Sequence, residues 1–153
     1  MSLMIKVLVL VLIWPQLVTT ASISPRKTFD DFGDINCEDE YARLDNFAIQ
    51  LHQDPNMTGV IIFYGGVTFR GRLPRRGDAA ARAARIKPYL VKRRGVPESR
   101  VIVINGGYAL EWTAQLWIVP QGMAIPTPFS TVDATKVKFR KGKANPRDFR
   151  CRI

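Results

Sequence analysis

The chain has 153 residues, of which 46% are apolar, and it carries a formal net charge of +10 at pH 7. This length and composition are enough for one folded domain with a buried core. Two cysteines and one histidine are too few for a closed zinc site, so no structural metal and no cofactor are expected.

The first 21 residues have the layout of a secretory signal peptide. Lys6 precedes an apolar run over residues 7–14, and residues 19–21 end in a small side chain suited to cleavage. The alternative is an uncleaved membrane anchor, but the run stops at Pro15, well short of the roughly 20 residues that span a bilayer. We therefore expect residues 1–21 to direct export to the periplasm or cell envelope.

The next segments predict a short strand, a helix, a buried strand and a loop. Residues 22–36 place three large apolar side chains in acidic surroundings, which indicates a short strand or hairpin. Apolar residues at steps of three and four over residues 38–53 predict an amphipathic helix. The β-branched and aromatic run 60–64 predicts a strand covered on both faces, and residues 67–77 predict a long basic loop.

A second helix is predicted after this loop. Asp78 is a suitable N-cap, the alanines that follow favour helix, and Gly95 ends the segment. Pro88 lies about ten residues inside, where it removes a backbone hydrogen bond and clashes with the preceding turn. We expect a kink over residues 84–88, or a break into two pieces.

Two further strands follow, over residues 100–104 and 112–119. The crossover helix predicts that the strands on either side of it run parallel, and the short link after residue 104 predicts that the last strand returns antiparallel. Residues 121–153 form a proline-containing linker and a basic tail, in which residues 135–139 are a candidate edge strand.

These elements predict the order β-α-β-α-β-β. The expected fold class is α+β, a sandwich with two helices packed on one face of a small mixed sheet, over residues 22–120.

The two cysteines become informative once export is assumed. An oxidising compartment favours disulfides, and Cys37 and Cys151 are the only pair that this chain offers. A bridge would close a loop of over 100 residues and contribute roughly 4–5 kcal/mol in the chain-entropy model. The alternative is two unrelated thiols.

Charge is distributed unevenly along the chain. Residues 30–54 hold eight acids and one arginine, whereas residues 70–100 hold eleven basic side chains and two acids. A basic surface on an exported protein favours anionic partners such as wall polymers, phospholipid headgroups or lipopolysaccharide. Export argues against nucleic acid as a partner, and the alternative reading is ordinary solubilising charge.

Several short motifs at defined spacings point to a family. They are Phe29-Asp30, Leu44-Asp45, Arg82-Ala83, Tyr89-Leu90 and the turn Gly95-Val96-Pro97. Together they resemble the C-terminal domain of OmpA-like and flagellar-motor stator proteins, and the resemblance covers residues 28–120. It implies a fold that binds the diaminopimelate side chain of the peptidoglycan stem peptide without catalysis.

The resemblance also implies ligand residues. Arg82 matches the family's ligand-binding arginine, whose guanidinium can hold a carboxylate in a bidentate pair. The family's acidic partner for the ligand ammonium is replaced here by Gly65 and Gly66, so either Asp78 substitutes or the chain binds something else. The two glycines are candidates for close ligand approach, with tight turns as the alternative.

The sequence contains no recognisable nucleophile motif and no phosphate-cradling glycine loop, so an enzyme is not expected. We expect an exported, non-enzymatic binding domain for peptidoglycan or another anionic envelope polymer. The alternative is a degenerate OmpA-like scaffold that binds a protein partner.

Overall fold

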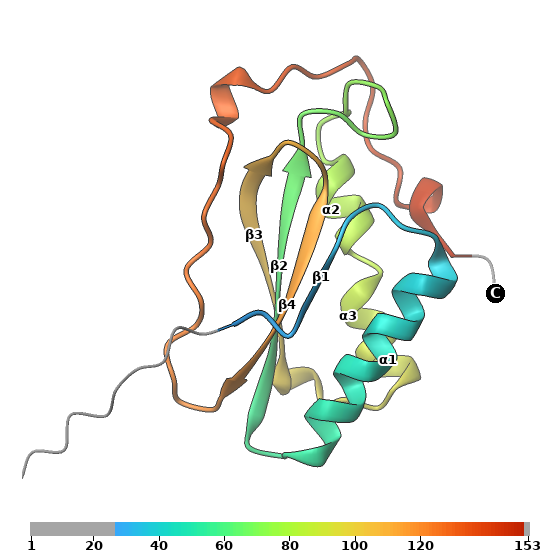
Figure 1. Ribbon diagram of the computed structural model, residues 1–153. Coiled ribbons are helices and arrows are strands. Elements are labelled where there is room, and N and C mark those ends of the chain that lie inside the picture. Colours follow the sequence, from blue (N-terminus) through green and yellow to red (C-terminus); the bar gives the residue numbers. More distant parts are fainter. Residues whose placement is uncertain (1–26, 152–153) are drawn as a thin grey trace, which may run out of the picture.

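The computed structural model describes residues 27–151, so the predicted signal peptide lies outside the described residues. Its centre is a four-stranded mixed sheet in the order β1-β4-β2-β3 (Figure 1). The strands are β1 (Asp30–Phe32), β2 (Met57–Gly66), β3 (Val101–Ala109) and β4 (Thr113–Pro120). β2 and β3 run parallel, and β4 is antiparallel to both β2 and β1.

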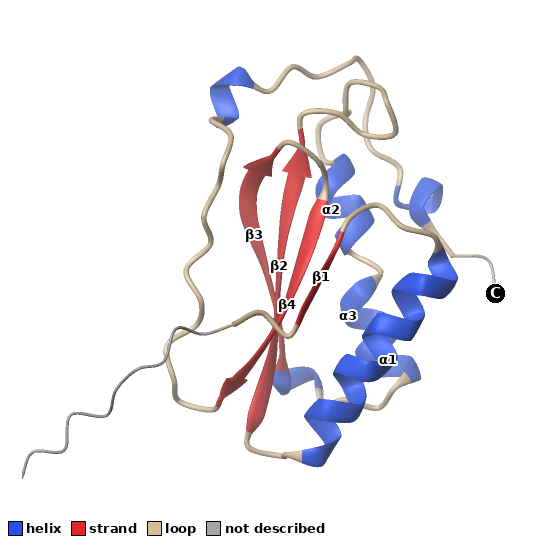
Figure 2. Ribbon diagram, in the orientation of Figure 1, coloured by secondary structure: helices blue, strands red, loops and turns tan. Residues whose placement is uncertain are grey.

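The helices pack together on one face of this sheet (Figure 2). α1 (Cys37–Gln53) begins at Asn36, whose side chain accepts a hydrogen bond from the Asp39 amide. The second helical segment is broken into α2 (Asp78–Ala83), α3 (Ile86–Pro88) and a π-helical turn (Tyr89–Arg93). This confirms the α+β class and the break predicted over residues 84–88, which falls at residues 84–85.

The main core lies between the helices and the sheet. Leu44, Phe47 and Leu51 of α1 meet Ile61 of β2 and Leu90 of the second helical segment, and all five are fully buried. The buried side chains of α1 recur at steps of three and four residues, as the sequence predicts for an apolar helix face. Within residues 27–151, no helix is both long and apolar enough to cross a membrane.

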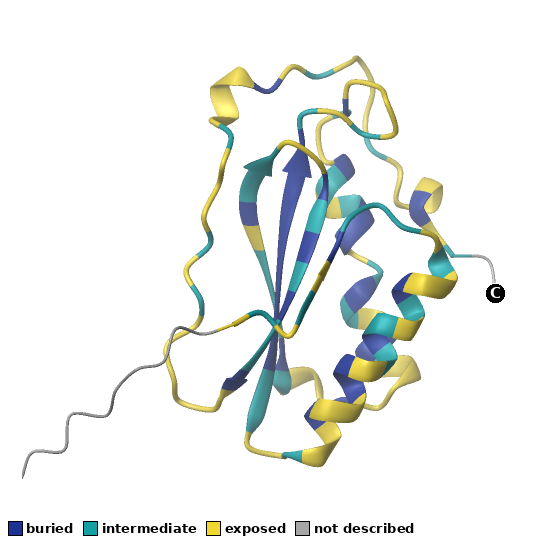
Figure 3. Cartoon of the chain, in the orientation of Figure 1, coloured by how far each residue is buried: buried dark blue, intermediate teal, exposed yellow. Residues whose placement is uncertain are grey.

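The opposite face of the sheet is covered by residues 121–133. The Phe129 amide donates to the Tyr64 hydroxyl over 3.2 Å, and the Val132 amide donates to the Tyr108 carbonyl over 3.0 Å. Residues 59–66 of β2 are buried throughout, as Figure 3 shows by the dark colour of this strand. β2 is therefore covered on both faces, as its continuous apolar run predicts.

Three expectations about the strands need correction. β3 continues through Gly106 and Gly107 to Ala109 instead of ending at residue 104, because β2 is also long enough to pair Gly65 with Tyr108. β4 returns antiparallel, but it pairs with β2 and β1 and not with β3, which precedes it.

The third correction concerns the tail. Residues 135–139 form no strand, since Ala134–Lys136 is a short 3-10 helix. Val137 is nevertheless buried, and Phe139 packs edge-on to Tyr108. The apolar residues that suggested a strand are thus explained by packing of the tail onto the domain.

Candidate functional site

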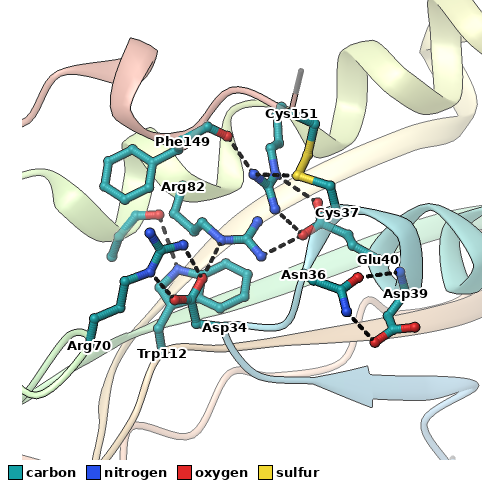
Figure 4. A network of polar contacts seen from close by, with 12 residues as sticks. Asp34, Asn36, Cys37, Asp39, Glu40, Arg70, Arg82, Trp112, Phe149 and Cys151 are labelled. Carbon is teal, nitrogen blue, oxygen red and sulfur yellow. Dashed lines mark hydrogen bonds and ion pairs between the residues drawn. A yellow bond between two sulfur atoms is a disulfide. The ribbon is translucent and has the colours of Figure 1, made fainter. Parts of the chain in front are cut away.

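Arg82, which the resemblance predicts to be a ligand-binding arginine, is fully buried and paired within the chain. Its Nε donates to Asp34 Oδ1 over 3.0 Å, and its Nη2 lies 2.5 Å from Glu40 Oε2 (Figure 4). Its guanidinium carbon lies 4.4 Å from the ring centroid of Trp112, a cation–π contact. α2 positions the arginine, the first turn of α1 supplies Glu40, and the link between β1 and α1 supplies Asp34.

The ion pairs extend from Arg82 to both sides. Arg70 Nε donates to Asp34 Oδ2 over 2.5 Å, and Arg85 Nε donates to Glu40 Oε1 over 2.9 Å. We call this set of three arginines and two carboxylates the buried ion cluster. Glu40 is fully buried, so both of its arginine partners are needed to offset the cost of removing its charge from water.

A disulfide lies beside the buried ion cluster. The bond between Cys37 and Cys151 is formed, with a sulfur–sulfur distance of 2.05 Å, which confirms the predicted pairing. Arg85 contacts both segments that the disulfide joins. Its Nη1 donates to the Phe149 carbonyl in the tail and lies 3.8 Å from Cys37 Sγ at the start of α1 (Figure 4). The last turn of the tail is thereby attached to the start of α1.

This arrangement leaves little of Arg82 for a ligand. Neither Nη1 nor Nη2 has a hydrogen-bond partner of good geometry among the described residues, although Nη2 lies within ion-pair distance of Glu40, and both nitrogens are buried from solvent. An external carboxylate could pair with this guanidinium only after displacing Asp34 or Glu40. In this structure Arg82 already has two carboxylate partners from its own chain, Asp34 and Glu40.

The pKa of Asp34 is lowered from its ordinary value of 3.8. Partial burial alone would raise it, but hydrogen bonds from Arg70 and Arg82, together with their positive charges, outweigh burial and favour the ionised carboxylate. A group whose folded pKa is depressed stabilises the fold above its unfolded pKa, and this stabilisation is lost as the pH falls through the folded value.

We therefore expect acid to weaken the fold partly through Asp34. The free energy of unfolding should fall as the pH drops below about 4, and the difference between the wild type and Asp34→Asn should shrink over the same range. Urea titrations at a series of pH values from 6 down to 2 measure both quantities. A wild type–variant difference that stays constant through this range would show that Asp34 does not titrate as the geometry requires.

The other three candidate residues meet elsewhere. Asp78 is 2% exposed, and its carboxylate accepts hydrogen bonds from the Arg75 amide over 2.7 Å and Arg75 Nε over 3.1 Å. It is the first residue of α2, and Gly77 is the N-cap in its place. Gly65 and Gly66 lie inside β2, so the tight-turn interpretation is wrong.

Gly65, Gly66 and Asp78 line one cavity of about 20 Å³. That is room for about one water molecule and not for an amino-acid side chain. Arg82 does not line this cavity. The structure thus brings three of the four candidates together, without Arg82 and without space for the expected ligand.

Gly66 is required by close backbone packing. A Cβ at this position would lie 2.3 Å from the Thr68 carbonyl oxygen and 2.7 Å from the Trp112 amide nitrogen. We expect Gly66→Ala to lower the free energy of unfolding by about 3 kcal/mol, the upper part of the range for overpacking, because backbone atoms cannot turn away. Chemical denaturation compares it with Gly33→Ala, whose Cβ would meet nothing closer than 3.5 Å. Equal stability of the two variants would contradict this reading.

The basic loop and the basic tail, which the sequence suggests separately, lie side by side at one end of the molecule (Figure 1). The Arg140 amide donates to the Pro74 carbonyl over 3.0 Å, and a β-bridge joins Arg76 to Lys143. The guanidinium of Arg76 also lies 4.6 Å from the ring centroid of Phe139. Pairing of Cys151 with Cys37 is the one sequence signal that could have placed the tail near this end.

We call the exposed cations of residues 72–76 and 138–143 the basic surface. They are Arg72, Arg76, Lys138, Arg140, Lys141 and Lys143. Within residues 27–151, none of these six side chains forms an ion pair with a carboxylate.

The described part of the chain, residues 27–151, holds no cluster of three or more His, Cys, Asp or Glu that could bind a metal ion.

A scan against protein-family models and a search of curated proteins found no match to this chain. The candidate site therefore stands on its geometry and charge.

Proposed function

We propose that this protein is an exported, non-enzymatic domain of OmpA-like fold that binds peptidoglycan or another anionic polymer of the cell envelope through its basic surface. The observation that carries the proposal is a set of six exposed cations, on two adjacent segments, that the described chain leaves without carboxylate partners. Such a surface attracts a polyanion over several ångströms and gains from many weak contacts at once.

The buried ion cluster favours polymer binding at the basic surface over polymer binding at Arg82. A clamp for a single ligand carboxylate needs an accessible arginine, whereas Arg82 is 0% exposed and already paired with two carboxylates. The basic surface requires no rearrangement of the core. Binding there depends on charge at the surface, and it should weaken as salt rises.

Co-sedimentation with purified diaminopimelate-type peptidoglycan tests the proposal, at about 150 mM salt so that loose attraction is screened. We expect the wild type to pellet and Arg76→Glu/Lys143→Glu to lose about tenfold in affinity, since two attractive contacts become repulsive. The matched control is Lys92→Glu/Arg93→Glu, which makes the same charge change at two exposed residues near the far end of α1, where the Arg94 carbonyl contacts His52. This control should pellet like the wild type.

Two results would contradict the proposal. Equal loss in the two double variants would show that only net charge matters and that the basic surface is no site. Failure of the wild type to pellet would end the wall-binding proposal and favour the alternative, a scaffold that binds a protein partner.

A further inference from the structure

The basic surface contains a pocket that the proposed function does not need. It lies between loop 67–77 and the tail, has a volume of about 330 Å³, and is lined by Arg70, Arg72, Arg75 and Arg140. We call it the arginine pocket. Its volume falls at the lower end of the range for small-molecule sites.

The charge of the arginine pocket selects among anions. Its four guanidinium groups face two carboxylates, Asp78 and Asp148, both of which pair with Arg75. The residues that line the pocket therefore carry a formal charge of +2. Because Arg70 also pairs with Asp34, which lies outside the lining, Arg72 and Arg140 are the two lining arginines that have no carboxylate partner within residues 27–151. A phosphate monoester carries about −1.5 to −2 at neutral pH and neutralises this charge, whereas a single carboxylate does not.

Two of the arginines have donors to spare. The side chain of Arg72 makes no hydrogen bond or ion pair within residues 27–151. Arg140 uses only Nε, which donates to the Leu73 carbonyl over 3.0 Å, and this leaves both of its terminal nitrogens available. Forked guanidinium donors match the oxygens of a phosphate group.

The loop holds Arg72 in place through a tight turn. The Phe69 amide donates to the Arg72 carbonyl over 2.7 Å, and the Arg72 amide donates back over 3.1 Å. Arg70 and Gly71 between them both have positive φ, 50° and 72°, as in a type I′ turn. The two hydrogen bonds fix the backbone of Arg72 relative to that of Phe69, at the cost of a positive φ at Arg70.

The floor of the pocket is apolar. Phe69 and Phe149 pack edge-to-face with their ring centroids 5.4 Å apart, and Phe149 is 4% exposed. Phe149 lies two residues before the disulfide at Cys151, so the covalent bond fixes this wall. Leu73, which is 43% exposed, adds accessible apolar surface that the carbon skeleton of a sugar phosphate can cover.

We propose that the arginine pocket binds a phosphate monoester on a sugar-sized group, with Arg72 and Arg140 as the phosphate-binding side chains. This goes beyond the proposed function, which concerns a polymer and all six cations of the basic surface, of which only Arg72 and Arg140 line the pocket. The phosphate can belong to a soluble sugar phosphate or to a headgroup in a membrane, and the chemistry of recognition is the same.

Isothermal titration of the disulfide-bonded, full exported chain with glucose 1-phosphate at about 150 mM salt tests the soluble form. Sedimentation with phosphatidylcholine vesicles containing phosphatidic acid tests the membrane form.

We expect saturable binding in at least one of the two assays and no binding of glucose. The double variant Arg72→Gln/Arg140→Gln should lose about tenfold in affinity, because it removes two charge-assisted contacts. Arg76→Gln/Lys143→Gln loses the same charge outside the pocket and should change affinity less than about twofold.

Arg140 also fastens the tail, so Arg72→Gln alone serves as a second variant, which removes no hydrogen bond or ion pair of the described residues. It should weaken binding about fivefold. No saturable binding in either arm would overturn the proposal, and so would equal losses in the two double variants. Because the wall-binding test changes Arg76 and Lys143, peptidoglycan pelleting without phosphate binding would reject only the arginine pocket.

Discussion

Arg82→Ala is expected to lower the free energy of unfolding by about 3–5 kcal/mol, because it leaves the carboxylates of a buried ion cluster without their shared partner. Glu40 is 0% exposed and would keep only Arg85. A domain of this size has a total stability of about 5–15 kcal/mol, so the variant would be close to unfolding at physiological temperature. Thermal and urea unfolding, followed by circular dichroism on the oxidised protein, measures the loss.

The matched control for Arg82→Ala is Arg94→Ala. Arg94 pairs with Asp45 at the surface, where the two side chains are 42% and 33% exposed. Exposed pairs of this kind contribute about 0–1 kcal/mol, so the control should stay near wild-type stability. If Arg82→Ala unfolds no more easily than Arg94→Ala, Arg82 is not a structural residue and its assignment to ligand binding regains weight.

Replacing both cysteines, as Cys37→Ser/Cys151→Ser, is expected to lower the free energy of unfolding by about 4–5 kcal/mol in the chain-entropy model. The estimate follows from the sequence separation of 114 residues, because a long loop loses much entropy when the unfolded chain is cross-linked. Urea unfolding of the double variant and the wild type under oxidising conditions provides the comparison. Changing both residues leaves no free thiol to form mixed disulfides.

A local readout separates this effect from general damage. Without the bond, the hydrogen bond from Arg85 to the Phe149 carbonyl and the burial of Phe149 depend on non-covalent contacts alone. Amide hydrogen exchange should therefore rise over residues 137–149 more than over the middle of α1. A loss of less than about 1 kcal/mol with unchanged exchange in the tail would contradict the role given to the disulfide.

Local patterns were sufficient to predict most of the elements. The apolar stripe of α1 and the continuous run of β2 are properties of neighbouring residues, so their positions could be derived without a structure. The break at residues 84–85 follows from one missing amide and one steric clash at Pro88. The parallel pairing of β2 with β3 follows from the helix that connects them.

Contacts between distant residues could not be predicted in this way. The burial of Arg82 depends on Asp34, which lies 48 positions earlier in the chain, and nothing in the residues beside Arg82 indicates that partner. The insertion of β4 between β1 and β2 is likewise a long-range choice. The basic surface could not be predicted either, because it forms only when the tail folds back beside loop 67–77. The sequence suggested that the tail is a linker with a short strand.

We propose that wall binding uses the basic surface and not Arg82. The most direct test compares peptidoglycan pelleting by Arg82→Lys and by Arg76→Glu/Lys143→Glu, with circular dichroism confirming that both are folded at the temperature of the assay. Arg82→Lys keeps the buried positive charge but removes the fork that a ligand carboxylate would need. We predict that Arg82→Lys pellets like the wild type and that the surface variant stays in solution. Loss of pelleting in Arg82→Lys with full pelleting of the surface variant would contradict the account.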